Sequence, residues 1–219
     1  MRLFLCGDVM PGRGIDQILP HPCDPDLHES HMQSALGYVE LAEAAYGPIR
    51  RPVDPAYIWG AALDELRQLR PDARIVNLET SITRSDDWAA KGINYRMSPQ
   101  NAVCLSAAAI DCCVLANNHV LDWGQAGLRE TLATLAGLHI KTAGAGPSSE
   151  RAVAPAVLDI AGKGRILVFS MASATSGVPS NCRKVTRSYA QGPGPHRECL
   201  DKRGSQTREP TGSESAVRR

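Results

Sequence analysis

Short apolar runs alternate along most of this chain with longer stretches in which apolar residues recur at helical spacing. The short runs have the length of buried strands, and the longer stretches have the length of helices. An alternation of this kind predicts an α/β fold built on a mainly parallel sheet. The predicted strands are residues 2–6, 73–78, 111–116 and 140–143, and the predicted helices are residues 34–45, 55–69, 99–109 and 123–137.

A hairpin is predicted after the fourth strand, where residues 156–160 and 166–171 flank Gly162-Lys163-Gly164. The two loops before the first long helix are rich in glycine or proline and predict irregular backbone. In the second of them His28 and His31 are three residues apart, a spacing that suits a metal ion on a helix face. No further Cys or His completes a tetrahedral set, so a surface loop is the favoured interpretation.

The amino-acid composition of the chain changes near residue 181. Residues 182–219 hold nine basic and four acidic side chains but only three large apolar ones, whereas residues 1–181 hold 15 basic and 19 acidic side chains. A segment with so little apolar area cannot offset its ordering entropy. The sequence therefore predicts a folded domain over residues 1–181 and a disordered basic tail over residues 182–219. Without interleaved aromatic residues this tail predicts no specific nucleic-acid binding.

Cysteine content and the first residues bear on the compartment. The chain has seven Cys residues, an odd number, without a C-x-x-C pair, which favours reduced thiols over a disulfide framework. The apolar stretch within residues 1–10 is too short for a signal peptide or a membrane span. These features predict a cytoplasmic protein with no membrane span in this chain.

Polar side chains stand where three of the predicted strands end. Asp8 follows the first strand, Asn77 and Glu79 close the second, and Asn117-Asn118-His119 follows the third. Each group taken alone is explained equally well as turn or cap chemistry. The ends of neighbouring parallel strands converge at one edge of a sheet, however, so the three groups together predict a cluster of oxygen and nitrogen ligands.

Such a cluster suits two divalent metal ions that activate a water molecule to attack an ester or related bond. In this hypothesis Asp8 is a terminal ligand, Glu79 a bridge, Asn118 a ligand, and His119 a general acid or oxyanion partner. Asp122 and Gln125 have capping-box spacing, which predicts a helix that begins directly behind His119 and favours an anion in the loop.

The loop over residues 84–98 offers further groups for an anion. Lys91, Tyr95 and Arg96 are candidate contacts, although a solvated loop is the favoured interpretation of this polar stretch.

Four segments together resemble a known family. They are Gly-Asp-Val-Met-Pro-Gly-Arg at 7–13, Asn-Leu-Glu-Thr-Ser at 77–81, Asn-Tyr-Arg-Met at 94–97 and Asn-Asn-His-Val-Leu-Asp-Trp-Gly at 117–124. In this order they resemble the poly-gamma-glutamate capsule-synthesis (CapA-like) family, which is similar to calcineurin-like metallophosphatases.

The resemblance implies a metallophosphatase-like two-sheet sandwich flanked by helices, and a metal pair of Mn, Fe, Zn or Mg. It implies action on a polyglutamate-like or phosphoester substrate. The site residues that follow are His119 as the catalytic residue, Asp8, Glu79 and Asn118 as metal ligands, and Arg13, Asn77, Arg96 and Asn117 as anion or substrate contacts.

The chain also departs from the family pattern. Met10 stands where metallophosphatases usually have a His, and the only His after His139 is His196, which no predicted strand precedes. Our interpretation is that the resemblance stops near residue 181, as in a truncated or frameshifted chain, which leaves the C-terminal part of the fold incomplete. Our hypothesis is that the incomplete ligand set leaves half a metal site, which binds no ion or one ion weakly, and that an exposed apolar sheet face promotes self-association. Two functions stay open: a metal-dependent hydrolase, or an inactive remnant or binding module that keeps the front half of the fold.

Overall fold

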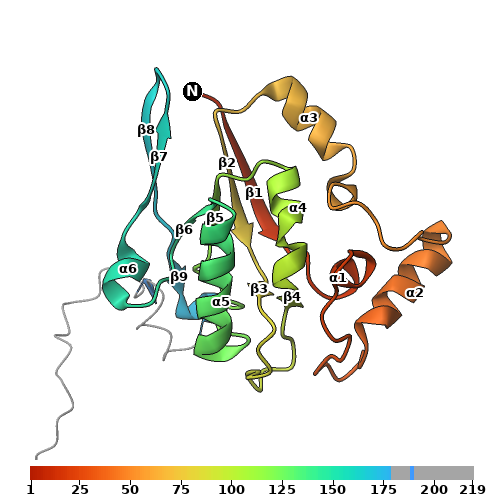
Figure 1. The fold of residues 1–219 in the computed structure, drawn as a ribbon. Helices are drawn as coiled ribbons and strands as arrows, with labels where there is room; N and C mark the ends of the chain where they lie inside the picture. Colours follow the sequence, from red (N-terminus) through yellow and green to blue (C-terminus); the bar gives the residue numbers. More distant parts are fainter. Residues whose placement is uncertain (179–187, 190–219) are drawn as a thin grey trace, which may run out of the picture.

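The computed structural model describes residues 1–178 and 188–189. Its centre is a parallel sheet with strand order β1-β2-β5-β6 (Figure 1). The strands are β1 (Leu3–Val9), β2 (Ala73–Leu78), β5 (Cys112–Val114) and β6 (Lys141–Ala143). The register aligns Ile75 with Leu5 on one side and with Cys112 on the other. Since all four strands are parallel, their carboxyl ends meet at one edge.

Each face of the sheet has its own apolar core. On one side Val76, Leu78 and Cys113 pack with Leu105 and Leu135 of the covering helices. These helices are η2 (Pro99–Ala102), α4 (Val103–Ala107) and α5 (Gly124–Gly137). On the other side Ile75 and Cys112 pack against a hairpin of β7 (Ala156–Ile160) and β8 (Gly164–Val168). Alternate side chains of β2 thus enter different cores, as the pleat of a strand requires.

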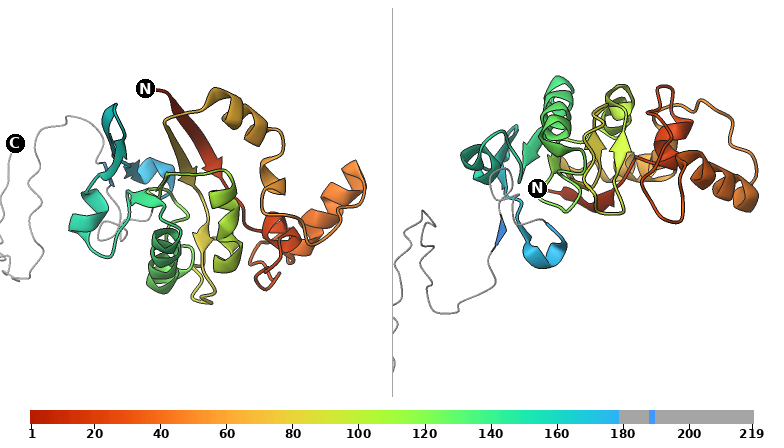
Figure 2. Two further views of the ribbon diagram at one scale, coloured as in Figure 1. Left: turned by 45° about the horizontal axis from the view of Figure 1, so that its top comes forward. Right: turned by 90° about the horizontal axis from the view of Figure 1, so that it is seen from below.

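The remaining elements surround this sheet, and Figure 2 shows α1 and α2 beside its β1 end. The helices are α1 (Gly14–Ile18), α2 (Ala35–Tyr46), η1 (Tyr57–Trp59), α3 (Ala62–Leu69), α6 (Ser149–Val153) and η3 (Ala174–Ser176). Two short parallel pairs complete the described part: β3 (Ser81–Ile82) with β4 (Arg96–Met97), and β9 (Ala172–Ser173) with β10 (Ser188–Tyr189).

The predicted class is confirmed: the structure is a mixed α/β fold with a parallel sheet flanked by helices, consistent with a metallophosphatase-like fold. Strand 73–78 and the hairpin are also confirmed, and Ser34 caps α2 by accepting a hydrogen bond from the backbone N of Leu36. No helix in the described residues is both long and apolar enough to cross a membrane.

Several predicted boundaries were wrong: the third strand is Cys112–Val114 instead of 111–116, and the second hairpin strand is Gly164–Val168 instead of 166–171. The first strand continues past residue 6 to Val9, through an irregularity in its register with β2. The predicted helix over 55–69 is divided into η1 and α3 at Gly60, whose φ of 49° is left-handed. Residues 84–98 are not a solvated loop throughout, because Arg96–Met97 pairs with Ser81–Ile82. The predicted tail, residues 182–219, lies outside the described residues except for the backbone of Ser188–Tyr189.

Candidate functional site

The ends of β1, β2 and β5 converge as predicted, and two asparagine side chains join them. Asn77 Nδ2 donates hydrogen bonds to Asp8 Oδ1 at 2.9 Å and to Glu79 Oε2 at 3.1 Å. Asn117 Nδ2 in turn donates to Asn77 Oδ1 at 3.0 Å and to the backbone oxygen of Leu78 at 2.9 Å. Asn77 and Asn117, predicted as anion or substrate contacts, are therefore engaged in holding the two carboxylates in place.

The pKa values of the two carboxyl groups of this cluster are shifted in opposite directions. Hydrogen bonds that Asp8 accepts from Asn77 and from Glu79 lower the pKa of Asp8 below its ordinary value. Burial, together with the neighbouring Asp8 carboxyl, raises the pKa of Glu79 above its ordinary value. Two close carboxyl groups compete for one proton, and here Glu79 keeps the proton to higher pH than Asp8.

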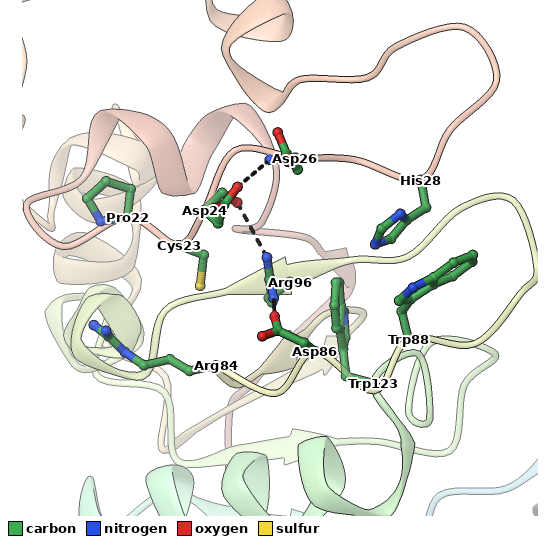
Figure 3. Close-up of a pocket in the computed structure, with 10 residues that line it drawn as sticks. All are labelled: Pro22, Cys23, Asp24, Asp26, His28, Arg84, Asp86, Trp88, Arg96 and Trp123. Carbon is green, nitrogen blue, oxygen red and sulfur yellow. Dashed lines mark hydrogen bonds and ion pairs between the residues drawn. The ribbon is translucent and has the colours of Figure 1, made fainter.

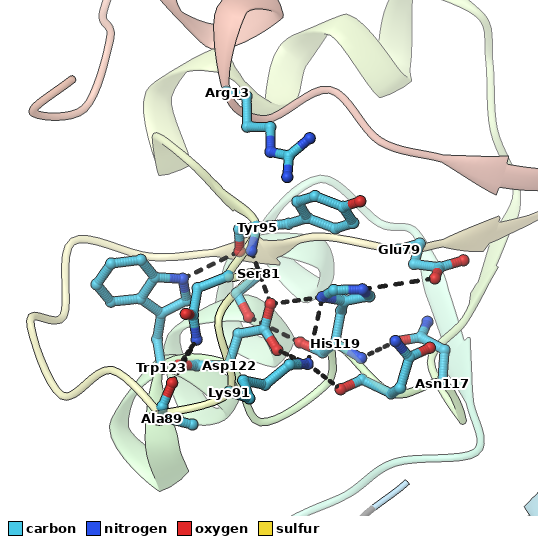
Figure 4. Close-up of polar contacts among 12 residues, drawn as sticks. Arg13, Glu79, Ser81, Ala89, Lys91, Tyr95, Asn117, His119, Asp122 and Trp123 are labelled. Carbon is cyan, nitrogen blue, oxygen red and sulfur yellow. Dashed lines mark hydrogen bonds and ion pairs between the residues drawn. The ribbon is translucent and has the colours of Figure 1, made fainter. Parts of the chain in front are cut away.

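His119 is buried beside this pair and is held from three directions (Figure 4). Its backbone N donates to Asn117 Oδ1 at 3.0 Å, and its ring stacks on Tyr95 with 4.0 Å between centroids. Nδ1 lies 2.6 Å from Asp122 Oδ2, while Nε2 lies 3.8 Å from Glu79 Oε1. An ionised carboxylate can only accept a hydrogen bond, so the contact with Asp122 places the hydrogen of the neutral ring on Nδ1. Nε2 then carries no hydrogen and faces Glu79.

Asp122 is not the helix cap that its spacing to Gln125 predicted. Helix α5 begins at Gly124, and its N-cap, Trp123, makes no side-chain capping bond. The carboxylate of Asp122 is completely buried and accepts from Lys91 Nζ at 2.6 Å and from the backbone N of Tyr95 at 2.7 Å, besides its contact with His119. Because its oxygens bind these distant partners, the Asp122 carboxylate does not cap the helix as the local sequence pattern predicted.

Lys91 and Asp122 are functional-site residues whose roles the sequence did not reveal. Lys91 Nζ donates to the backbone oxygen of Asn118 at 2.7 Å as well as to Asp122, and thereby fixes the loop that follows β5. The Lys91 side chain comes from residues 84–98, for which a solvated loop was favoured, and that interpretation is wrong at this position. The three-residue spacing of His119 and Asp122 was the available signal, because one helical turn brings such a pair together.

The other predicted site residues lie in different places. Arg13 has its guanidinium 4.6 Å from the centre of the Tyr95 ring, on the face opposite His119. Arg96 stacks over Trp123 at 4.0 Å and pairs with Asp86 at 3.0 Å, at a separate cavity of about 460 Å³ (Figure 3). Asn118 contributes its backbone oxygen to Lys91. Arg96 is thus not part of the carboxylate cluster.

The two loop histidines, His28 and His31, form no metal pair. The His28 ring stacks on Trp88 at 4.0 Å between centroids, and His31 Nε2 lies 3.2 Å from the hydroxyl of Tyr38. Both rings belong to exposed residues, in agreement with the surface-loop interpretation.

Asp8 and Glu79 fit a hard divalent ion in part. Carboxylates that compete for one proton are close enough for a cation to neutralise both, and hard ions prefer oxygen ligands. In the described part of the chain no three His, Cys, Asp or Glu side chains are grouped closely enough to hold an ion. The described residues therefore fit one ion on the Asp8 and Glu79 pair, with amide, backbone or water oxygens completing its coordination.

A parallel α/β sheet with carboxylates, amides and one oriented imidazole at its carboxyl edge is consistent with a metallophosphatase-like fold. The chain belongs to the bacterial capsule synthesis protein family PGA_cap, whose family model matches residues 2–216. This confirms the resemblance found in the four sequence segments.

Two curated relatives are similar to most of the chain. Both are described as a probable polyglutamine synthesis accessory protein, from Mycobacterium tuberculosis strains CDC 1551 / Oshkosh and ATCC 25618 / H37Rv. Each is 46% identical over 180 residues, which is 82% of this chain and 47% of the relative. The chain thus spans about half the length of these relatives.

Proposed function

We propose that this chain acts in the synthesis or processing of a glutamate polymer of the bacterial capsule, as a metal-dependent hydrolase of ester or related bonds. Membership of the capsule synthesis family and the description of the two relatives support the biological role. The observation that carries the chemistry is the convergence of Asp8, Glu79 and His119 at one edge of the sheet, with Asn77 bonded to both carboxylates.

The chain's own groups have separable tasks in this proposal. Asp8 and Glu79 hold the divalent ion, with Asn118 as a further candidate ligand from the loop after β5. When bound, such an ion supplies a nucleophilic water at neutral pH. His119 presents Nε2 toward the carboxylate pair. Because Asp122 holds the hydrogen on Nδ1, Nε2 of the neutral ring accepts a proton, and the imidazolium so formed can give that proton to a leaving oxygen or stabilise an oxyanion.

Asp122 and Lys91 act through His119 as positioning residues. Asp122 holds the Nδ1 hydrogen, and Lys91 neutralises Asp122 within 2.6 Å. An imidazole held in this way keeps one tautomer and one ring orientation, which general acid catalysis needs. Tyr95 restricts the ring further by stacking on its face at 4.0 Å.

The test is a calorimetric titration of the purified chain with Mn²⁺, combined with turnover of a chromogenic phosphomonoester and phosphodiester. The proposal expects Mn²⁺ uptake and metal-dependent turnover, both lost in Asp8→Ala and reduced at least tenfold in Asn118→Ala. Asp159→Ala is the matched control, because Asp159 pairs with Arg165 on the exposed hairpin, away from the site. Equal uptake and turnover in Asp8→Ala and Asp159→Ala would refute the proposal.

A second candidate is a non-catalytic module that keeps the fold without the reaction. The observation that favours it is that the described residues bring no three His, Cys, Asp or Glu side chains together at metal-binding distance. In the same titration this candidate expects no Mn²⁺ uptake, or weak uptake of one ion without turnover. The presence or absence of metal-dependent turnover thus separates the two functions.

A further inference from the structure

An apolar cavity of about 350 Å³ lies beside the reaction site, between α1 and α2. Its walls are aliphatic: Ile15 and Ile18 come from α1, Val39 and Ala42 from α2, and Ile49 from the segment after α2. The volume is at the lower end of the range for small-molecule sites, about 300–1,000 Å³. It is roughly twelve times the 30 Å³ that a water molecule takes in the liquid, so it holds roughly ten heavy atoms.

One end of this cavity is polar and is formed by Arg13. The guanidinium lies between two tyrosine rings, 4.6 Å from the Tyr95 centroid and 5.0 Å from that of Tyr38. Arg13 Nη2 is 2.5 Å from Oε1 of the buried Glu29. Among the described residues Arg13 Nε has no hydrogen-bond partner although the atom is buried. A buried donor without a partner is costly, and a bound acceptor would remove that cost.

The backbone of Arg13 is also unusual, with φ 51° and ψ −128°. This region is occupied almost only by glycine, and strained residues of this kind concentrate at ligand-binding sites. The strain places the guanidinium over Tyr95, whose opposite partner in the stack is His119 (Figure 4). The polar end of the cavity is thus one aromatic ring away from the reaction site.

We propose that this cavity binds an aliphatic carboxylate, with the chain among the isoleucine side chains and the carboxylate on Arg13. Glu29 neutralises the guanidinium overall, but an arginine has five N–H donors and the contact with Glu29 uses only part of them. A carboxylate would pair with the remaining donors, and the chain would remove apolar surface from water. The ligand class follows from this combination of one fixed cation and aliphatic walls.

The experiment is an NMR titration of the full chain labelled at isoleucine methyl groups, with hexanoate, octanoate, decanoate and 1-octanol as probes. Burial of each methylene should tighten binding about fourfold until the cavity is full, so octanoate should bind roughly fifteenfold tighter than hexanoate. Shifts should concentrate on Ile15, Ile18 and Ile49. Shifts concentrated on Ile160 and Ile166 of the hairpin, or equal affinity for hexanoate and octanoate, would overturn the proposal.

Three variants make the test specific. Ala42→Phe fills the cavity and should abolish octanoate binding, whereas Ala44→Phe, on the exposed face of the same helix, should leave it unchanged. Arg13→Gln should remove the preference for octanoate over 1-octanol. Equal binding by Ala42→Phe and Ala44→Phe, both verified as folded by circular dichroism, would overturn the proposal. Because the readout is binding without metal or turnover, its failure is distinct from failure of the proposed function.

Discussion

The ion pair of Lys91 and Asp122 joins two charges of unequal exposure: the Asp122 side chain is completely buried, and that of Lys91 is 27% exposed. Asp122 is also the group that orients His119. A buried carboxylate that loses its cation keeps its desolvation cost, whereas its remaining hydrogen bonds compensate only in part. The stability of the molecule and the orientation of its imidazole therefore depend on the same contact.

We predict that Lys91→Met lowers the free energy of unfolding by about 3 kcal/mol, because it leaves Asp122 buried without its cation. Urea denaturation followed by tryptophan fluorescence measures this loss. Arg51→Met is the control, since Arg51 pairs with Glu43 in a contact with both side chains partly exposed, and it should cost less than about 1 kcal/mol. Similar losses in both variants would contradict the special role of the buried pair.

Asp16 provides a prediction about pH at a buried residue away from the site. Its carboxylate accepts hydrogen bonds from the backbone N of Cys23 at 2.7 Å, from that of Ser98 at 3.0 Å, and from Asn101 Nδ2 at 2.7 Å. Burial nevertheless raises the pKa of Asp16 above its ordinary value of 3.8. Ionisation therefore costs more in the folded than in the unfolded chain.

A raised folded-state pKa means that Asp16 contributes its full stability below the unfolded-state pKa and loses this contribution as the pH rises through the folded-state pKa. The difference in unfolding free energy between the wild type and Asp16→Asn should therefore be largest below about pH 4 and shrink at higher pH. Urea titrations across this range measure it. Asp64→Asn, on an exposed face of α3, corrects for the loss of a surface carboxylate. A difference that grows with pH would contradict the prediction.

At the scale of elements, the carboxyl end of β6 is a point of close approach. Gly144 follows this strand with φ 89°, and a Cβ built there would lie 2.7 Å from the Cβ atoms of both Ala116 and Ser170. The loop after β5 and the segment after β8 thus meet at a position without a side chain. Both the left-handed backbone and the lack of space require glycine here.

We predict that Gly144→Ala lowers the free energy of unfolding by about 2 kcal/mol, through backbone strain and overpacking. Gly137→Ala is a matched control at the last residue of α5, where an added Cβ meets nothing within 4 Å. Because alanine favours helix over glycine by up to about 1 kcal/mol, that variant should be neutral or stabilised. Thermal unfolding by circular dichroism compares the two, and an equal effect would contradict the argument.

Elements with strong local patterns could be predicted from the sequence, and those that depend on distant partners could not. Strand 73–78 was found because Ile75 and Val76 enter different cores, so that consecutive positions in the middle of the run are apolar. Helix 34–45 was found from its apolar period. The pairing of β3 with β4 was missed, since two-residue strands leave no periodic signal.

In the candidate site, too, residues placed by local patterns could be predicted, and residues placed by distant partners could not. Asp8, Glu79 and His119 could be grouped because the ends of parallel strands converge by geometry. The role of Lys91 could not be predicted, because its partner Asp122 is 31 residues away and no local pattern links them. The capping-box prediction at Asp122 failed for the same reason: tertiary contacts outweighed a local preference.

At the scale of the whole molecule, the two faces of the sheet are covered unequally. The hairpin packs on Ile75 and Cys112 toward the β6 end. In the described part of the chain, Leu3 and Leu5 of β1 on that same face remain 43% and 68% exposed. Further exposed apolar side chains are Leu167, Phe169 and Met171. Since β1 is also an edge strand, this side of the molecule combines apolar surface with unpaired backbone groups.

Self-association therefore stays our prediction for these residues, because exposed apolar side chains and an unpaired strand edge favour pairing between copies. Sedimentation velocity should show an average mass that rises with protein concentration, and the double variant Leu5→Lys, Leu167→Lys should sediment as a monomer throughout. Leu41→Lys changes an equally exposed leucine, at 60%, on α2 and should leave association intact. If the wild type stays monomeric, or if Leu41→Lys abolishes association as completely as the double variant, the apolar face of β1 and the hairpin does not drive assembly. The added lysines oppose association in two ways, by charge repulsion and by the cost of desolvating an ammonium group. Because salt screens the repulsion, the association that the double variant regains at high salt measures how much of the effect is repulsion.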